Sequence, residues 1–351
     1  MARLKTAAIY IMSVSLCVML IVYADTSTEA AAGAVKRCLN ILIPSLFVFM
    51  AAAGIIIRSG AYKVLSLSFY PVAKYIFGIP YELFSVVLIS NIAGFPVGAS
   101  MLRELLDSGR IDRRTASLMQ CFCFGGGPSF SVGVIGLCLF ADKRAGFIIC
   151  LSAMLANLTA ALIICRVLKL RINKAEKPRE FGSNDIIACT EKAGVSMLMI
   201  CALIIIFCVI MADVQRLIAG RISIPAQAQV LISSVFEISG ITALDGARIG
   251  FIPVIAGLYS FGGVCVLMQI AAAAGGKYSL MPFFITRLPI SLISMAYAHL
   301  LCSHVYDEAV ECLAVGRNCI VNFNNFVPSI CLILMIFLLL FKKGVAFLRQ
   351  M

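Results

Sequence analysis

The chain has 351 residues, of which 62% are hydrophobic and 13% are charged, and its mean hydropathy is +1.02. Soluble domains carry about 25% charged residues, so the composition excludes an ordinary soluble protein and predicts an all-α, polytopic membrane protein. A net charge of +12 would suggest nucleic acid as the partner of a soluble protein. Here the Lys and Arg residues cluster in short loops, as on the cytoplasmic side of membrane proteins, so we expect the lipid bilayer and no nucleic acid as partner.

The first half of the chain contains apolar segments of different kinds. Residues 1–35 are expected to form an N-terminal anchor helix and a connection, with a cleaved signal peptide as the alternative. Residues 38–57 predict a transmembrane helix, and residues 62–79 predict an amphipathic helix at the interface. Residues 82–101 and 118–140 are apolar but interrupted by Gly and Pro, so we expect broken or re-entrant segments there.

A long helix is expected over 146–168, followed by a basic linker over 169–192 that we place in the cytoplasm. The second half, 193–302, then repeats the pattern of the first half, 36–168. Its expected segments are a helix at 193–212, a weakly amphipathic stretch at 213–226, a broken segment at 227–244, and helices at 249–273 and 280–302. The C-terminal part, 303–351, is expected to hold a polar stretch and a final helix at 326–341.

The two halves share short sequence elements in the same order. Val87-Leu88-Ile89-Ser90 recurs as Val230-Leu231-Ile232-Ser233, and Phe124-Gly125-Gly126 recurs as Phe261-Gly262-Gly263. Basic residues at both termini and in the linker place all three in the cytoplasm, so helices 38–57 and 193–212 should run antiparallel. We therefore predict two inverted repeats with about eight transmembrane helices plus broken segments, the architecture of a secondary transporter.

The breaks of the first half are candidates for a substrate site. Asn91, Gly94, Pro96 and Gly98 interrupt an apolar run, and freed backbone groups survive in a membrane only where they are packed or line a wet cavity. A glycine-mediated helix contact is the alternative. The second break contains Gly126, Gly127, Pro128 and Ser129. A helix starting at Pro128 would direct free N–H groups towards an anion, whereas a turn at the membrane surface is the alternative.

The second half contributes Glu237, Ser239, Gly240, Gly262 and Arg287 to the same candidate site. A carboxylate at membrane depth is costly and is usually functional or paired, so Glu237 could couple transport to a proton or a cation, unless it lies at the interface. Arg287 could bind a substrate carboxylate as a planar fork or pair with Glu237 at rest. Snorkelling of Arg287 to the headgroups is the alternative.

The sequence does not indicate catalysis, cofactor binding or metal binding. We expect no enzymatic activity and no cofactor, because the chain lacks nucleotide-binding, nucleophile-elbow and dinucleotide motifs. His299, Cys302 and His304 form only a loose trio, so no metal site is expected. The oligomeric state cannot be predicted from these patterns.

Four segments resemble sporulation integral membrane proteins of the YlbJ/SpoVV type, which contain Gate ("nucleoside recognition") domains. They are Ala93–Ala99, Gly127–Gly136, Phe236–Ile241 and the helix that carries Arg287. The resemblance covers roughly residues 36–345. Related proteins often have Asn before the proline where this chain has Gly125-Gly126-Gly127, which puts polar contacts there in doubt.

This resemblance implies two Gate-like repeats, 36–168 and 193–302, and a place in the bacterial cell membrane, specifically the outer forespore membrane. It implies movement of dipicolinic acid, a small planar organic anion, during sporulation. Two alternatives stay open: a carrier of nucleosides or other small solutes, and a sporulation membrane assembly protein that transports nothing.

Overall fold

The computed structural model describes residues 2–168, 170, 181–219 and 224–306. Over these ranges the chain is helical and contains no strand, as the composition predicts. In the first half, the helices are α1 (Ala2–Val22), α2 (Ala24–Arg37), η1 (Cys38–Leu42), α3 (Ile43–Arg58), α4 (Ala61–Leu67), η2 (Val72–Phe77), α5 (Tyr81–Ile92), α6 (Phe95–Asp107), α7 (Arg113–Gln120), η3 (Ser129–Leu139) and α8 (Lys143–Val167), where η1 to η3 are π-helical.

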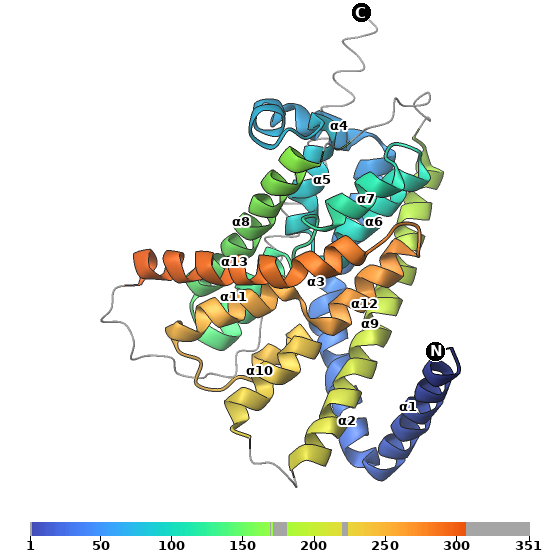
Figure 1. Ribbon diagram of the computed structural model, residues 1–351, viewed down its shortest axis with the longest axis vertical. Helices are drawn as coiled ribbons and strands as arrows, with labels where there is room; N and C mark the ends of the chain where they lie inside the picture. Colours follow the sequence, from blue (N-terminus) through green and yellow to red (C-terminus); the bar gives the residue numbers. More distant parts are fainter. Residues whose placement is uncertain (1, 169, 171–180, 220–223, 307–351) are drawn as a thin grey trace, which may run out of the picture.

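In the second half, the helices are α9 (Ser183–Ala219), α10 (Ala226–Phe236), the 3₁₀ turns η4 (Ile238–Ala243) and η5 (Ile249–Phe251), α11 (Ile252–Phe261), α12 (Gly263–Ala274) and α13 (Met281–Val305). The helix α13 runs at a large angle to α3 and α9 (Figure 1). Its direction brings residues of the second half against the glycine-rich loop of the first half.

The longest packed elements form an antiparallel pair. The segments α2, η1 and α3 follow one another without interruption and pack along α9, which runs in the opposite direction (Figure 1). At one end Ser27 donates to Asp213, and at the other end Arg58 contacts Asp185. The inverted repeat requires this antiparallel arrangement of α3 and α9, while the repeat itself remains a prediction.

Two predicted boundaries of α9 are wrong. The helix begins at Ser183, inside the predicted linker, and continues to Ala219, through most of the stretch predicted as a separate amphipathic segment. At its start, the negative charge of Asp185 interacts favourably with the positive end of the helix dipole, and its carboxylate contacts Arg58. Near its end, the buried Asp213 is held by Ser27. Polar residues at both ends therefore extend the helix instead of ending it.

The predicted breaks lie close to where the sequence places them. The helix α5 ends at Ile92 and α6 begins at Phe95, with Gly94 between them at φ +108° and ψ 157°, a conformation open to glycine alone. A non-helical loop, residues 121–128, joins α7 to η3. In the second half, the helix predicted over 249–273 is interrupted at Gly262, which has φ +84° and separates α11 from α12. The helix α4, which lies in the stretch predicted to be interfacial, also bends away from α3, by 86°.

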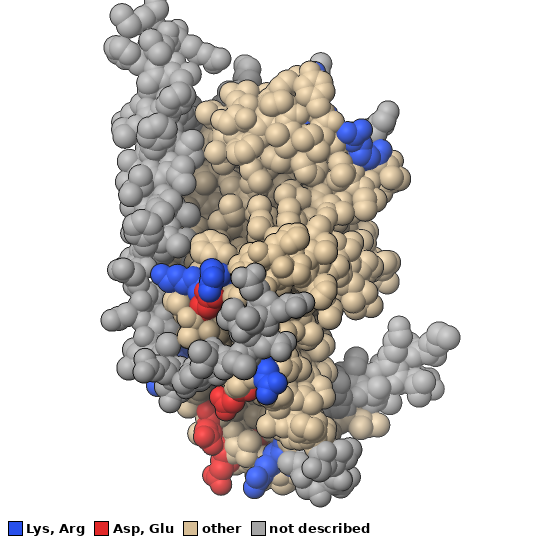
Figure 2. Space-filling model, turned by 90° about the vertical axis from the view of Figure 1, so that its left-hand side faces the viewer, with Lys and Arg blue, Asp and Glu red and all other residues tan. Residues whose placement is uncertain are grey.

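Four helices within the described ranges are long and apolar enough to cross a membrane, or up to six if each bent helix pair counts as one span. The four are Lys143–Val167, Ser183–Ile218, Ile249–Ala274 and Met281–Val305. About eight crossings thus remains a prediction, and the expected final helix at 326–341 lies outside the described residues. The face in Figure 2 has a broad uncharged region, with most of its charged side chains in the lower part. Such a surface suits contact with lipid.

Candidate functional site

The glycine breaks of the two halves meet. A Cβ atom added at Gly126 would lie 2.5 Å from the Tyr259 ring and 2.6 Å from the Phe95 ring. A Cβ atom added at Gly262 would lie 2.7 Å from the ring of Phe124. The hydroxyl of Tyr259 also donates a 3.0 Å hydrogen bond to the carbonyl oxygen of Gly127. Only residues without a side chain permit this close approach, so the glycines fix the junction between the halves.

A small cavity of about 40 Å³, here called the central cavity, lies at this junction. Its walls come from η1, α3, α6, η3, α9 and α12, together with the breaks. Six of the predicted site residues line it: Pro96, Gly126, Gly127, Ser129, Glu237 and Ser239. The cavity is large enough for water molecules. Six of the predicted residues thus share the wall of one cavity, while its role as a substrate site stays a prediction.

The other predicted residues shape the junction without lining the cavity. Asn91 is buried, and its amide donates to the carbonyl oxygens of Val87 (2.8 Å) and Phe122 (3.0 Å). Gly98 packs against the backbone of Cys123, and Gly94 packs against Leu46. Pro128 comes directly before η3, Gly240 donates its N–H to Glu237, and Gly262 packs against Phe124. Pro128 thus precedes a helix, as its position predicts.

Glu237 lies in the break after α10 and is 4% exposed. Its carboxylate accepts hydrogen bonds from the backbone N–H groups of Ser239 and Gly240, both at 3.1 Å, and from the Ser239 hydroxyl. It therefore caps the 3₁₀ turn η4. The predicted resting pair with Arg287 is absent among the described residues, because the carboxylate is satisfied by its own loop. Its burial removes the carboxylate from the protein surface, while its depth in the membrane stays a prediction.

Arg287 is fully buried on α13, which excludes the snorkelling alternative. Its Nη2 donates to the carbonyl oxygen of Cys121 and lies 3.5 Å from Oδ1 of Asn157. The guanidinium carbon lies 4.6 Å from the centre of the Phe124 ring and 4.8 Å from that of Phe283. Its Nε and Nη1 are buried and have no hydrogen-bond partner among the described residues. The Nη2 group is thus held, whereas Nε and Nη1, which do not share a hydrogen-bonding edge of the guanidinium, keep unpaired N–H groups.

Arg287 and the central cavity are separated by aromatic rings. Phe124, which stacks against the guanidinium, lies 4.9 Å from Phe95 between ring centres, and Phe95 lines the cavity. The ring of Phe95 also lies 5.8 Å from that of Tyr259. Arg287 therefore belongs to the same junction, one aromatic layer behind the cavity wall.

Three polar residues of the junction were missed as site residues. Asn157 on α8 donates to Oδ1 of Asn91 at 2.7 Å and to the carbonyl oxygen of Phe124. Tyr259 joins α11 to the loop before η3, and Gln269 lines the cavity from α12. The signal for Asn157 is its place as a lone amide at the centre of an apolar helix. Tyr259 and Gln269 stand in apolar runs without a comparable signal.

No family model and no solved structure matches the chain. Among curated proteins, the chain is similar to the sporulation integral membrane protein YlbJ of Bacillus subtilis (strain 168). The two are 22% identical over 162 residues, which is 46% of this chain and 40% of that protein. The similarity supports the resemblance to YlbJ-type proteins, while the Gate domain stays a prediction. The chain is a multi-pass helical membrane protein that resembles a sporulation integral membrane protein.

Proposed function

We propose that the chain is a secondary transporter of a small organic anion. The observation that carries this proposal is the buried, half-occupied guanidinium of Arg287 at the junction of the glycine breaks. A buried charge without a counter-charge is costly, and an anionic substrate would supply the missing partner. Arg is suited to this role because a carboxylate can accept a hydrogen bond from its unpaired Nε or Nη1, and can form two parallel hydrogen bonds if it replaces the Cys121 carbonyl oxygen at Nη2.

Dipicolinate is our specific candidate, moved across the outer forespore membrane during sporulation. It is a small planar dianion, and one of its carboxylates can accept a hydrogen bond from an unpaired N–H group of Arg287 while the aromatic ring suits Phe124 and Phe283. The similarity to a sporulation integral membrane protein supports this choice. The candidate is too large for a cavity of about 40 Å³, so Phe95 and Phe124 must rearrange when it binds.

Glu237 is the group that we propose takes up a coupling proton or cation. It lines the central cavity, is nearly fully buried, and is reached by the water molecules that the cavity can hold. Acidic residues inside membranes commonly serve in proton relays. In this scheme Arg287 binds the substrate and Glu237 binds the coupling ion, on either side of the same aromatic layer.

A nucleoside is the second candidate substrate. Aromatic side chains of Phe49, Phe95 and Phe130 line the central cavity together with the amide of Gln269, and Arg287 is not in its wall. These groups suit the stacking and hydrogen bonding of a neutral base.

Uptake into liposomes that contain the purified full-length protein tests both candidates. We expect labelled dipicolinate to accumulate above the level in empty liposomes, with excess unlabelled dipicolinate abolishing the signal and a nucleoside leaving it unchanged. Uptake of labelled uridine, blocked by other nucleosides and not by dipicolinate, would replace the first candidate by the second. Absence of uptake of either solute at normal protein abundance in the liposomes would refute transport of both.

A further inference from the structure

A second, larger cavity lies at the end of the molecule where α3 ends and α9 begins. This linker-side cavity measures about 450 Å³, within the range of pockets that hold small molecules. It is lined by polar and charged side chains, among them Arg103, Glu104, Glu191 and Lys192, and by the apolar Met50 and Met101. Nothing in the junction described above uses this space.

The two cavities lie along the same four helices. On α3 the central cavity contacts Leu46 and Phe49, and the linker-side cavity contacts Ala53 and Gly54 further along the helix. On α9 the linker-side cavity contacts residues between Ala188 and Ser196, near the start of the helix. The central cavity contacts Ile200 and Ile204 further along it. The helices α6 and α12 follow the same pattern. The two cavities therefore lie at successive levels along the same helices.

Buried apolar residues stand between the two sets of lining residues along three of these helices. Val97 on α6, Met197 on α9 and Ile270 on α12 occupy the positions between the two sets of lining residues, and all three are buried. Met50 and Met101 form part of the linker-side lining and are also buried. Methionine is unbranched and adapts to changed packing, so Met50, Met101 and Met197 can change conformation when the neighbouring helices move.

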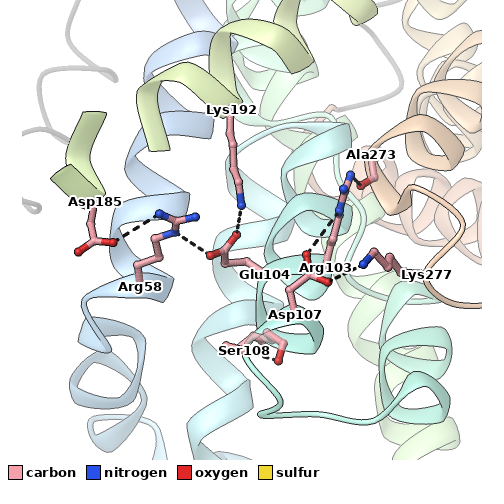
Figure 3. Close-up of polar contacts among 10 residues, drawn as sticks. Arg58, Arg103, Glu104, Asp107, Ser108, Asp185, Lys192, Ala273 and Lys277 are labelled. Atoms are coloured by element: carbon pink, nitrogen blue, oxygen red, sulfur yellow. Dashed lines mark hydrogen bonds and ion pairs between the residues drawn. The ribbon is translucent and has the colours of Figure 1, made fainter. Parts of the chain in front are cut away.

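Ion pairs hold the helices together beside the linker-side cavity (Figure 3). Glu104 on α6 binds Arg58 of α3 at 2.7 Å and Lys192 of α9 at 2.9 Å. Arg58 also contacts Asp185 of α9 at 3.5 Å. On the other side, Asp107 of α6 contacts Lys277, just after α12, at 3.3 Å, and Arg103 of α6 lies 3.4 Å from the carbonyl oxygen of Ala273 on α12. All four helices are thus joined through α6.

We propose that α3, α6, α9 and α12 enclose the route by which solute reaches the central cavity from the linker side, and that Glu104 closes this route by joining α3 to α9. This inference rests on the proposed transport function. The linker-side cavity is the entry vestibule, the Val97–Met197–Ile270 layer is the barrier, and the Glu104 ion pairs stabilise the closed arrangement. Opening requires α3 and α9 to separate from each other and from α6 at this end.

Accessibility of the central cavity tests the route without depending on transport. Ser129→Cys places a thiol in the cavity wall, and a membrane-impermeant thiol reagent is added to vesicles with known protein orientation. The rate of labelling is read for the peptide that contains residue 129 by mass spectrometry, which separates it from the native cysteines. Glu104→Gln is then added to this reporter, and Glu191→Gln serves as the matched control, because Glu191 lines the same cavity without an ion pair among the described residues.

We expect Glu104→Gln to raise labelling from the linker side about fivefold, because two partly buried ion pairs are lost. Glu191→Gln should leave the rate unchanged. An unchanged rate in Glu104→Gln, or an equal rise in both variants, would overturn the role of Glu104. Labelling of residue 129 only from the opposite side would overturn the route itself. The labelling result stands whether or not dipicolinate is transported, so failure of the route and failure of the proposed function can be told apart.

A reversible cross-link provides a second test. A Cβ atom at position 54 would lie 3.3 Å from the Cβ atom of the native Cys189, close to the spacing in disulfides. In Gly54→Cys, oxidation should join α3 to α9, prevent labelling of residue 129 from the linker side, and be reversed by a reductant. Gly54→Ser adds a side chain of similar size and cannot form the bond. Unaltered labelling after verified cross-linking would refute separation of α3 from α9.

Discussion

At the scale of a single residue, the guanidinium of Arg287 is held in one orientation and still has unpaired donors. Its Nη2 is held by the carbonyl of Cys121, and Phe124 and Phe283 stack against its faces, so the direction of the remaining N–H groups is fixed. The unpaired Nε and Nη1 then each present an N–H donor in a defined direction, on different sides of the guanidinium. In the proposed transport, the carboxylate would meet donors that the Cys121 carbonyl oxygen and Phe283 still orient when Phe124 moves aside.

Arg287→Lys should reduce transport at least about tenfold at equal abundance in the membrane. Lysine keeps the charge but loses the second donor of the fork and the stacking on Phe124. Initial uptake rates of labelled dipicolinate, normalised to protein by immunoblot, measure the effect. Arg248→Lys is the matched control, since Arg248 is exposed. Equal loss in both variants, or wild-type uptake in Arg287→Lys, would remove Arg287 from substrate binding.

Glu237→Gln tests the proposed coupling. Glutamine keeps the size of the side chain but cannot exchange a proton or balance a bound cation. We expect uptake driven by an imposed ion gradient to disappear, while exchange of internal for external substrate without a gradient persists. Both assays use the same liposomes with and without the gradient. A variant that still responds to the gradient as the wild type does would exclude Glu237 as the coupling group.

At the scale of elements, glycines decide how closely the broken segments approach. A Cβ atom at Gly98 on α6 would clash with the carbonyl oxygen of Cys123 and lie 3.0 Å from Cβ of Ser90. These neighbours are backbone or belong to a packed helix, so they cannot move aside at low cost. The junction therefore depends on small residues at defined positions and not only on the apolar pattern.

Gly98→Ala should lower the free energy of unfolding by about 1–3 kcal/mol, as overpacking does in a filled core. Thermal unfolding of the purified protein in detergent provides the measurement. Gly33→Ala on α2 is the control, because the added Cβ would meet only the flexible Arg37 side chain at 3.8 Å. We expect this control to be neutral or slightly stabilising. Similar melting temperatures for Gly98→Ala and the wild type would contradict the tight packing.

The breaks were predictable because Gly94, Gly126 and Gly262 stand inside otherwise apolar runs. The buried position of Arg287 could not be predicted, since the sequence alone does not tell a helix end at the interface from a helix that crosses the bundle. The absence of a Glu237–Arg287 pair has a similar cause. Glu237 accepts hydrogen bonds from residues two and three positions further along its own loop, and such local bonds depend on backbone dihedrals. The length of α9 was underestimated because polar residues at its ends resembled a linker.

At the scale of the whole molecule, charge is placed where the helices converge on the linker side. Burial disfavours the charged form of Glu104, but hydrogen bonds from Lys192 and Arg58 outweigh it and lower the pKa of this carboxyl. The folded-state pKa is thus below the unfolded value of about 4.3. The stabilisation by Glu104 is therefore complete above this value and is lost as the pH falls through the folded-state pKa.

The difference in melting temperature between the wild type and Glu104→Gln should accordingly be constant from about pH 5 to pH 8 and shrink below about pH 4. The measurement is thermal unfolding in detergent over this range at constant ionic strength. Glu191→Gln should show no such difference at any pH. A difference in melting temperature between the two proteins that increases as the pH falls would mean that Glu104 is not charged in the folded protein.

The length of α9 has a mechanical consequence. An uninterrupted helix from Ser183 to Ala219 is about 55 Å long, whereas the hydrocarbon layer is about 30 Å thick. If such a rod pivots near its midpoint, a rotation of about 10° moves each end by about 5 Å, in opposite directions. Ile200 and Ile204, beside the central cavity, lie close to that midpoint and would hardly move. The two ends of the helix would then shift in opposite directions about the proposed substrate site, so that separation at Lys192 is accompanied by an opposite shift at Asp213, where the hydrogen bond from Ser27 must adjust.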